Sequence, residues 1–66
     1  MKHTAHRNQK IGGYDYRGYY IHKPEGCKFW NVHKVDDDGI DFCFTEAICE
    51  SFSEAKITID CICGDF

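Results

Sequence analysis

The sequence predicts an α+β fold in which a three-stranded antiparallel meander carries one C-terminal helix packed on one face. Three observations support this fold class. The chain has 66 residues, 42% of them hydrophobic, which is enough for one small core. Its middle part alternates apolar and polar residues between turn sequences, as half-buried strands do. Its last part opens with a helix-capping sequence and continues with apolar residues at helical spacing.

The chain divides into a tail and a single small domain. Residues 1–13 are polar, show no hydrophobic period and end in Gly12–Gly13. Such a segment buries too little apolar surface to offset the entropy lost on ordering. We therefore expect a flexible basic tail over residues 1–13 and one small α+β domain over residues 14–66.

Turn sequences separate the three predicted strands. The first strand, residues 14–23, is rich in β-forming residues and stops at the P-E-G turn of residues 24–26. The second strand covers residues 28–35 and ends at the acidic turn D-D-D-G, and the third covers residues 40–44. Residues two apart share a face of a strand, and the more consistently apolar face is expected to form the core. Its members are Tyr19, Ile21, Trp30, Val32, Phe42 and Phe44.

A capping box marks the start of the predicted helix. Ser51 and Glu54 stand in the S-x-x-E spacing, in which each side chain accepts a hydrogen bond from the backbone of the other residue. Gly64 is a suitable stop. One stripe of the helix is apolar: Phe52, Ala55, Ile59 and Ile62. The alternative is a β-β-β-α-β order with the helix at residues 45–56 and a fourth strand at residues 57–63, because I-T-I-D-C-I-C also alternates.

Charge is distributed unevenly along the chain. Residues 1–13 carry three basic and no acidic side chains, whereas residues 14–66 carry five basic and eleven acidic ones. Because nucleic-acid binding depends on Lys and Arg at the phosphates, the acidic body disfavours a DNA-reading domain. No apolar run is long enough to cross a membrane, and the first residues lack a secretory signal. We therefore expect a cytoplasmic protein with no membrane partner.

The reactive side chains match no motif for catalysis or metal binding. The five cysteines are odd in number and lack the spacing of zinc knuckles, so we expect free thiols in a reducing cytosol. Aligning the acidic turn with a calcium-binding loop places Lys34 and Thr45 where carboxylates are required. Nothing in the sequence places a histidine beside a nucleophile and an orienting third group. We therefore predict a protein that is not an enzyme and that uses no metal and no cofactor.

Three segments carry a resemblance to known proteins. Y-R-G-Y-Y-I, F-W-N-V and S-F-S-E-A-K-I-T-I-D, within residues 16–60, resemble the pattern of many small phage and prophage accessory proteins. In these, a short sheet with a W-x-V strand precedes a helix of the type S-x-x-E-A-K-x-x-I-D. The cysteine content and the basic tail depart from that pattern. The resemblance implies a phage accessory role, such as a small inhibitor of a host defence enzyme, and transfers no catalytic residue.

The face opposite the predicted core is unusually aromatic. Aromatic side chains are favoured as interface anchors because they bring a large area with few rotatable bonds. This face either binds a different protein, pairs with itself in a homodimer, or consists of tyrosines that suit solvent-facing strand positions. Together with the acidic turn it supplies the predicted partner-binding residues: Tyr14, Tyr16, Tyr20, His22, Phe29, His33, Asp36, Asp37 and Asp38.

Two functions follow from these features. The first is a non-enzymatic protein-interaction module, a phage-encoded inhibitor of a host defence protein that acts by steric and electrostatic occupancy. Its acidic body suits a target with a basic, nucleic-acid-binding surface. The alternative is a small nucleic-acid-associated regulator, in which Lys2, Arg7 and Lys10 contact phosphates and the sheet aromatics stack on unpaired bases.

Overall fold

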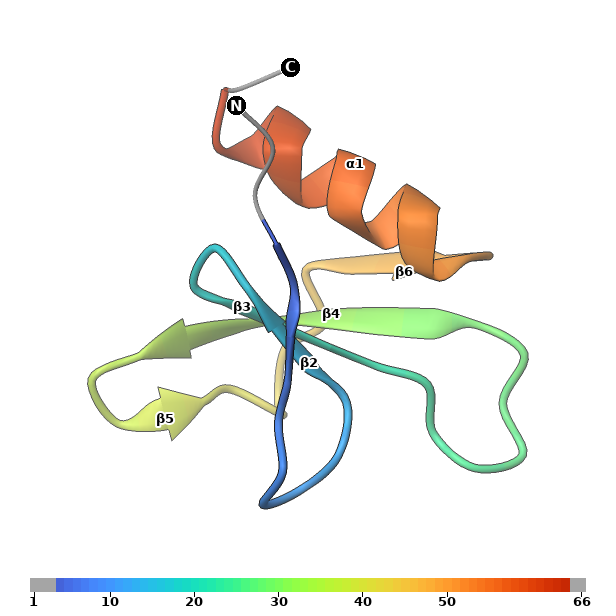
Figure 1. Cartoon of the computed structure of the whole chain (residues 1–66), viewed down its shortest axis with the longest axis horizontal. Coiled ribbons are helices and arrows are strands. Elements are labelled where there is room, and N and C mark those ends of the chain that lie inside the picture. Colours follow the sequence, from blue (N-terminus) through green and yellow to red (C-terminus); the bar gives the residue numbers. More distant parts are fainter. Residues whose placement is uncertain (1–3, 65–66) are drawn as a thin grey trace.

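An antiparallel sheet with one helix lying across it makes up the computed structural model, which describes residues 4–64 (Figure 1). Strands β1 to β4 follow one another in the sheet, and both β5 and β6 pair with β4. The α+β class with a C-terminal helix is confirmed, although the sheet has more strands than the three predicted. The elements are β1 (His6–Arg7), β2 (Tyr14–Tyr16), β3 (Tyr19–His22), β4 (Trp30–Asp36), β5 (Gly39–Ile40), β6 (Ala47–Cys49) and α1 (Phe52–Ile62).

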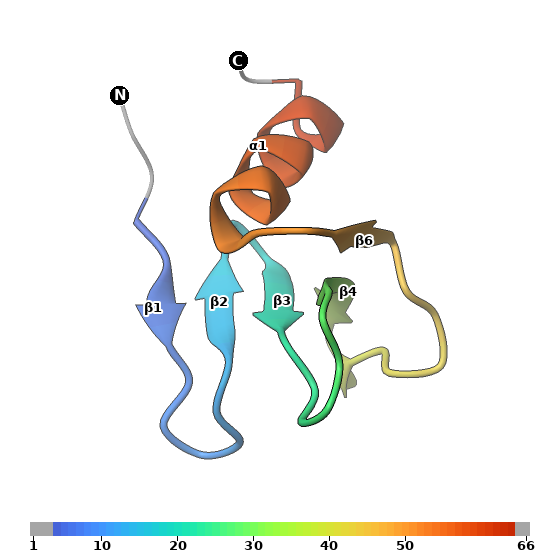
Figure 2. The ribbon, with the colours of Figure 1, turned by 90° about the vertical axis from the view of Figure 1, so that its right-hand side faces the viewer.

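The first predicted strand, residues 14–23, is in fact the hairpin of β2 and β3. Arg17 and Gly18 form its two-residue turn, with φ angles of 50° and 83°. Positive φ at both central positions defines the type I′ turn, whose twist matches that of two antiparallel strands. Figure 2 shows β2 and β3 side by side, with β1 beyond β2. The prediction of one continuous strand is wrong because Gly18 turns the chain.

Part of the segment predicted as a tail belongs to the sheet. β1 pairs antiparallel with β2. In the loop that joins the two strands, the Asn8 side-chain oxygen accepts hydrogen bonds from the backbone N–H groups of Lys10 and Ile11. These bonds offer the backbone the local partners that a turn requires. Of the predicted tail, only residues 1–3 lie outside the described residues.

β4 has two partners along one edge. β6 pairs with its first half and β5 with its end. The third predicted strand, residues 40–44, is limited to Ile40, because the Asp41 carboxylate accepts a hydrogen bond from the Cys43 N–H and turns the chain out of the sheet. Residues 41–46 then form the connection from β5 to β6.

The helix α1 begins where the capping box predicts. Ser51 Oγ accepts a hydrogen bond from the Glu54 N–H at 3.1 Å, and Glu54 Oε2 accepts one from the Glu50 N–H at 2.9 Å, one residue before the expected donor. Gly64, with a φ of 74°, follows the helix. The alternative fourth strand at residues 57–63 is therefore wrong. In the part of the chain that the structure describes, no helix has the length and apolar character that crossing a membrane needs.

The main core lies between the sheet and α1. Its buried residues come from four strands and the helix: Tyr16, Ile21, Val32, Cys49, Ala55 and Ile59. Tyr19, Trp30 and Phe52 pack at its margin. The predicted apolar stripe of the helix is therefore confirmed, except that Ile62 at its end is 47% exposed.

Two residues of the predicted core face lie outside the core. Phe42 is 55% exposed and Phe44 is 59% exposed, whereas Ile21 and Val32 are completely buried. The prediction is wrong for the two phenylalanines because the chain leaves the sheet at Asp41, so the period-2 pattern no longer determines which side they face.

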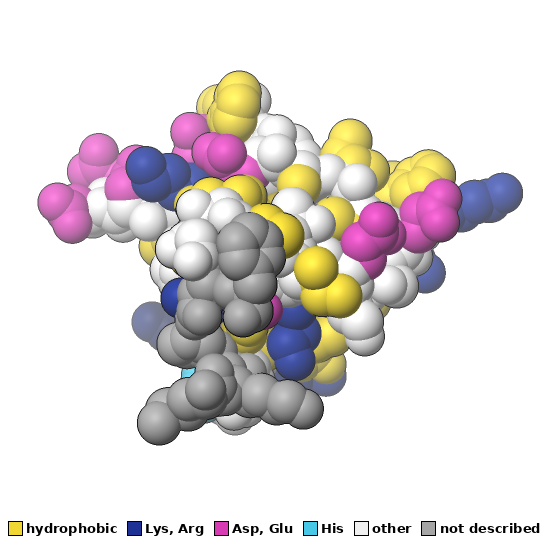
Figure 3. Space-filling model, turned by 90° about the horizontal axis from the view of Figure 1, so that it is seen from above, with side chains coloured by type: hydrophobic (Ala, Val, Ile, Leu, Met, Phe, Trp, Pro, Cys, Tyr) yellow, Lys and Arg dark blue, Asp and Glu magenta, His cyan; other side chains and the backbone are white. Residues whose placement is uncertain are grey.

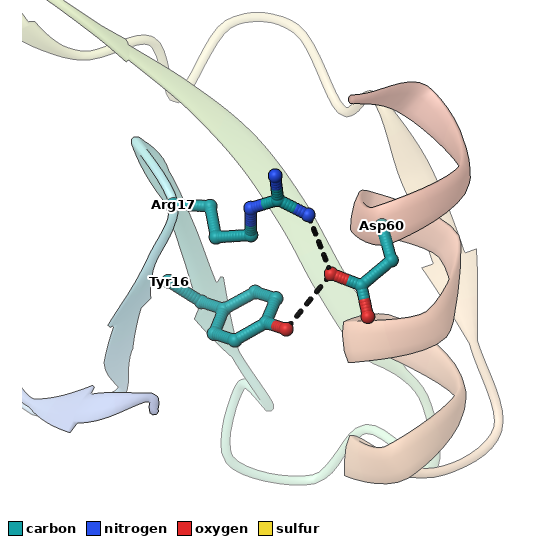
Figure 4. A network of polar contacts seen from close by, with 3 residues as sticks. All are labelled: Tyr16, Arg17 and Asp60. Carbon is teal, nitrogen blue, oxygen red and sulfur yellow. Dashed lines mark hydrogen bonds and ion pairs between the residues drawn. The ribbon is translucent and has the colours of Figure 1, made fainter. Parts of the chain in front are cut away.

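A polar network ties α1 to the β2–β3 turn (Figure 4). The Tyr16 hydroxyl donates a hydrogen bond to Asp60 Oδ1 at 2.8 Å, and Arg17 Nη1 lies 2.9 Å from the same oxygen. The Lys56 ammonium lies 5.6 Å from the centre of the Tyr16 ring. The Asp60 carboxylate of α1 is therefore held by Tyr16 and Arg17 of the hairpin. These contacts link the position of the helix to the geometry of the hairpin.

Candidate functional site

Tyr20, His22 and His33 meet on the face of the sheet that points away from α1. Tyr20 in β3 pairs directly with His33 in β4, and paired residues project to the same face. His22 follows two residues after Tyr20 and shares that face. The Tyr20 and His22 rings stack with their centres 5.2 Å apart. The prediction that these three side chains share a face is confirmed.

The loop at residues 41–46 covers this face. The Phe42 ring stands edge-on to Tyr20 and to His33, with centres 5.8 and 5.3 Å apart. The Phe44 carbonyl oxygen lies 3.0 Å from His33 Nδ1. As a result Tyr20 is only 2% exposed and His33 only 3%. The expectation of an open aromatic face is wrong for these two residues, because a loop distant in sequence packs on them.

His22 and His33 are joined through their ring nitrogens, with the two Nε2 atoms 3.0 Å apart. A carbonyl oxygen only accepts, so His33 Nδ1 carries the hydrogen that binds Phe44. Nε2 of a neutral His33 is then an acceptor, and His22 donates to it. Burial lowers the pKa of His22, and the neighbouring His33 lowers it further. The neutral form of His22 is therefore favoured.

Tyr14 and Tyr16 lie on the other face, against α1. The hairpin turn pairs Tyr16 with Tyr19, so the alternation of faces restarts after the turn. The Tyr14 ring contacts the Phe52 ring with centres 4.7 Å apart, and Tyr16 is 3% exposed. Their predicted position beside Tyr20 is therefore wrong. The sequence signal that indicates the hairpin is an X-Gly pair between two tyrosine-rich runs.

The other predicted partner-binding residues are exposed. Phe29 lies in the β3–β4 loop, and the three aspartates at residues 36–38 lie around the β4–β5 turn. Figure 3 shows acidic side chains projecting at the left end of the molecule, where this turn lies. The same stretch of chain continues to Phe42 and Phe44. We call residues 36–46 the acidic–aromatic segment; it carries five acidic and no basic side chains.

The acidic–aromatic segment has hydrogen bonds of its own that shape it. Asp36 Oδ1 accepts from the Asp38 N–H at 2.9 Å, and Asp41 Oδ1 accepts from the Cys43 N–H at 3.1 Å. A shallow hollow of about 230 Å³ lies along the turn, lined by Asp36, Asp38, Gly39, Ile40 and Asp41. These turns shape the backbone of a segment in which the carboxylates and Phe44 are exposed, while Phe42 is partly exposed and also contacts Tyr20 and His33.

The side chains of the acidic–aromatic segment decide what this site can bind. Comparisons with protein-family models, with curated proteins and with solved structures found no match to the chain. Within residues 4–64, no group of three or more His, Cys, Asp or Glu side chains is placed to hold a metal ion. Exposed carboxylates and phenyl rings bind through charge and through burial of apolar area.

Proposed function

We propose that this protein is a non-enzymatic interaction module that inhibits a partner protein by occupying its surface. The observation that carries the proposal is the exposure of Phe42 and Phe44, each more than half exposed, within a segment of five acidic side chains. Large exposed aromatic rings are costly to leave in water and are the usual anchors of protein interfaces. The binding surface that we propose is therefore the acidic–aromatic segment, in place of the sheet face predicted from sequence.

The charge of the segment selects the chemistry of the partner. Five carboxylates without a basic side chain complement a basic surface, and opposite charge raises the rate of encounter. A protein that binds nucleic acid presents such a surface, and an acidic ligand competes with nucleic acid for it. The resemblance to small phage and prophage accessory proteins supports a phage-encoded inhibitor of a host defence protein as the specific form of this function.

The nucleic-acid-associated alternative has less support. Stacking on unpaired bases needs open aromatic faces. Tyr20, the aromatic residue at the centre of the sheet face, is buried beneath the loop at residues 41–46. Two of the exposed rings, Phe42 and Phe44, stand among carboxylates that repel a phosphate backbone.

Affinity capture with matched variants tests the proposed function. The full chain is immobilised and incubated with host lysate, and the captured protein is identified and then titrated as a pure protein. Phe44→Ala removes an exposed ring, and Ile57→Ala is the control because Ile57 is 62% exposed on α1, outside the segment. We expect Phe44→Ala to weaken binding by about 1–3 kcal/mol and Ile57→Ala to leave it unchanged.

Salt and competition complete the test. Binding to a basic surface should weaken as ionic strength rises, and single-stranded nucleic acid should displace the protein from its partner. Capture of no protein at low salt, or equal binding by Phe44→Ala and the wild-type chain, would overturn the proposal. Sedimentation of the free protein as a dimer that Phe44→Ala dissociates would assign the segment to self-association instead.

A further inference from the structure

A row of side chains next to the covered part of the sheet stays open to solvent. On the face away from α1, His22 of β3 pairs directly with Asn31 of β4, and Asn31 pairs directly with Ile48 of β6. Directly paired residues project to the same face and lie next to each other. The Phe42 ring contacts the His22 end of the row, with the two ring centres 6.1 Å apart. These side chains form one continuous surface, which we call the open row: Phe42, His22, Asn31 and Ile48.

The two ends of the open row are apolar and exposed. Phe42 is 55% exposed and Ile48 is 66% exposed. Ala47 and Cys49, on either side of Ile48, pack in the core, so Ile48 itself projects away from that core. A single exposed apolar residue is ordinary, but two at the ends of one continuous surface supply a pair of anchors for a partner.

The polar centre of the open row offers a hydrogen-bond acceptor. His22 donates its Nε2 hydrogen to His33, so Nδ1 of the neutral His22 ring carries a lone pair and no hydrogen. Among residues 4–64, neither His22 Nδ1 nor the Asn31 amide has a hydrogen-bond partner, whereas every buried side-chain nitrogen and oxygen has one. Both groups are therefore accessible to solvent, and the bond to His33 determines that the accessible nitrogen of His22 is an acceptor.

The charge beside the open row favours a cationic donor. Burial lowers the pKa of His22, and His33 lowers it further, so the ring is neutral and accepts a hydrogen bond at neutral pH. Phe42 belongs to the acidic–aromatic segment, which has five acidic and no basic side chains. This charge repels a second copy of the chain, which carries the same segment. It attracts a Lys or Arg side chain, and such a side chain can donate to His22 Nδ1.

We propose that the open row binds a segment of a partner protein in which a lysine or arginine stands between two apolar side chains. The basic side chain donates a hydrogen bond to His22 Nδ1, and the apolar side chains pack on Phe42 and on Ile48. The Asn31 amide supplies a further donor and acceptor to the backbone of the segment. This inference rests on the proposed function, because it names the chemistry of the partner segment that contacts the same region of the protein.

The peptide acetyl-Leu-Ser-Arg-Ser-Leu-amide is the probe for this surface. In an extended peptide, residues two apart share a face, so its leucine and arginine side chains lie on one face over about 13 Å. His22 and Ile48 are two strand spacings apart, which is about 10 Å and within reach of a long arginine side chain.

Two-bond ¹H–¹⁵N NMR of the histidine rings reports which nitrogen carries a hydrogen. The full chain, labelled on histidine, is titrated with the peptide at neutral pH and low salt. We expect the hydrogen of free His22 on Nε2, and a shift of its Nδ1 signal as the peptide binds. A peptide with glutamate in place of arginine should bind at least about tenfold more weakly.

Two exposed isoleucines provide a matched pair of variants. Ile48→Ala removes one apolar anchor and should weaken peptide binding at least about fivefold. Ile57→Ala is the control, because Ile57 is 62% exposed on α1 and should leave binding unchanged. A hydrogen on Nδ1 of free His22, an unshifted Nδ1 at millimolar peptide, or equal binding by Ile48→Ala and the wild-type chain would overturn the inference.

The same variants separate this inference from the proposed function. A captured partner whose binding needs Phe44 but is unaffected by Ile48→Ala would leave the proposed function in place and overturn the inference. Peptide binding that depends on Ile48, with no protein captured from lysate, would support the open row as a binding surface and count against the inhibitor. A shift of His22 Nδ1 by single-stranded nucleic acid but not by the peptide would overturn the choice of a protein partner.

Discussion

At the scale of single residues, Gly13 lies so close to its neighbours that it leaves no room for a side chain. A Cβ atom at Gly13 would lie 2.6 Å from the Tyr20 hydroxyl oxygen and 2.8 Å from the Ile21 carbonyl oxygen. Gly12, with a similar positive φ, has open space around it. The Tyr20 hydroxyl also donates a hydrogen bond to the Gly12 carbonyl oxygen at 2.7 Å. Substitution of each glycine in turn therefore distinguishes the destabilisation caused by a left-handed backbone from the destabilisation caused by a steric clash.

Alanine at each glycine should destabilise the fold by different amounts. Gly12→Ala should cost about 1–2 kcal/mol, because an L-residue is strained in the left-handed region. Gly13→Ala should cost a further ~1–3 kcal/mol, because the Ile21 carbonyl oxygen belongs to a paired strand and cannot yield. Equilibrium urea unfolding of both variants measures the difference. Equal losses in the two variants would contradict the close packing at Gly13.

The histidine pair makes stability depend on pH. Burial and the neighbouring His33 lower the pKa of His22, so the unfolded chain binds a proton on His22 more readily than the folded chain does. Stability should therefore fall as pH drops below the ordinary histidine value of about 6.5. Urea unfolding between pH 7.5 and 5, in buffer with a chelator, measures this slope. His22→Gln should flatten the slope, and a variant with the wild-type slope would refute the assignment to His22.

At the scale of elements, local side-chain chemistry decides where each strand and helix ends. Ser51 and Glu54 open α1, and the Asp41 side chain ends β5 by binding the backbone two residues ahead. Both signals can be predicted from sequence, since capping and Asx turns involve residues close in the chain. The Arg17–Gly18 turn is equally local, but its effect on the pairing of β2 with β3 depends on where the strands begin.

The Ser51 cap should contribute about as much to the free energy of unfolding as helix caps do in other proteins. Ser51→Ala removes the acceptor for the Glu54 N–H and should cost about 1 kcal/mol. Ser51→Asp should keep the stability near that of the wild type, since a carboxylate accepts the same bond. Ser53→Ala serves as the control, because Ser53 is exposed inside the helix and should change stability by less than about 0.5 kcal/mol. Thermal melting that ranks Ser53→Ala as the more harmful alanine variant would contradict the cap.

At the scale of the whole molecule, both faces of the sheet are covered. The helix α1 buries one face, and the loop at residues 41–46 covers the other through Phe42 and the Phe44 carbonyl. A domain of this size has little core to spare, so a second packed cluster is a substantial part of its stability. The Tyr20 side of the sheet is therefore packed inside the protein, and the binding surface that we propose is the exposed acidic–aromatic segment.

Truncating a tyrosine on the covered face should unfold the protein as readily as truncating a core aromatic. Tyr20→Ala removes a buried ring and its hydrogen bond and should cost about 3–5 kcal/mol, similar to Trp30→Ala. Phe29→Ala is the exposed control and should cost less than about 1 kcal/mol. Chemical unfolding followed by circular dichroism measures all three. If Tyr20→Ala were as stable as the wild type, the result would contradict the buried position of Tyr20 and support the open aromatic face predicted from sequence.

The sequence by itself determined the α+β class and the face that Ile21 and Val32 present to the core, and its capping box favoured the position of α1 that the structure shows. These features depend on hydrophobic period and capping, which are properties of neighbouring residues. Only the tertiary structure decided that Tyr16 faces the helix and that Tyr20 and His33 lie beneath a loop. The physical reason is that a two-residue turn reverses the alternation of faces, while the covering loop is joined to β3 and β4 by contacts between residues distant in sequence.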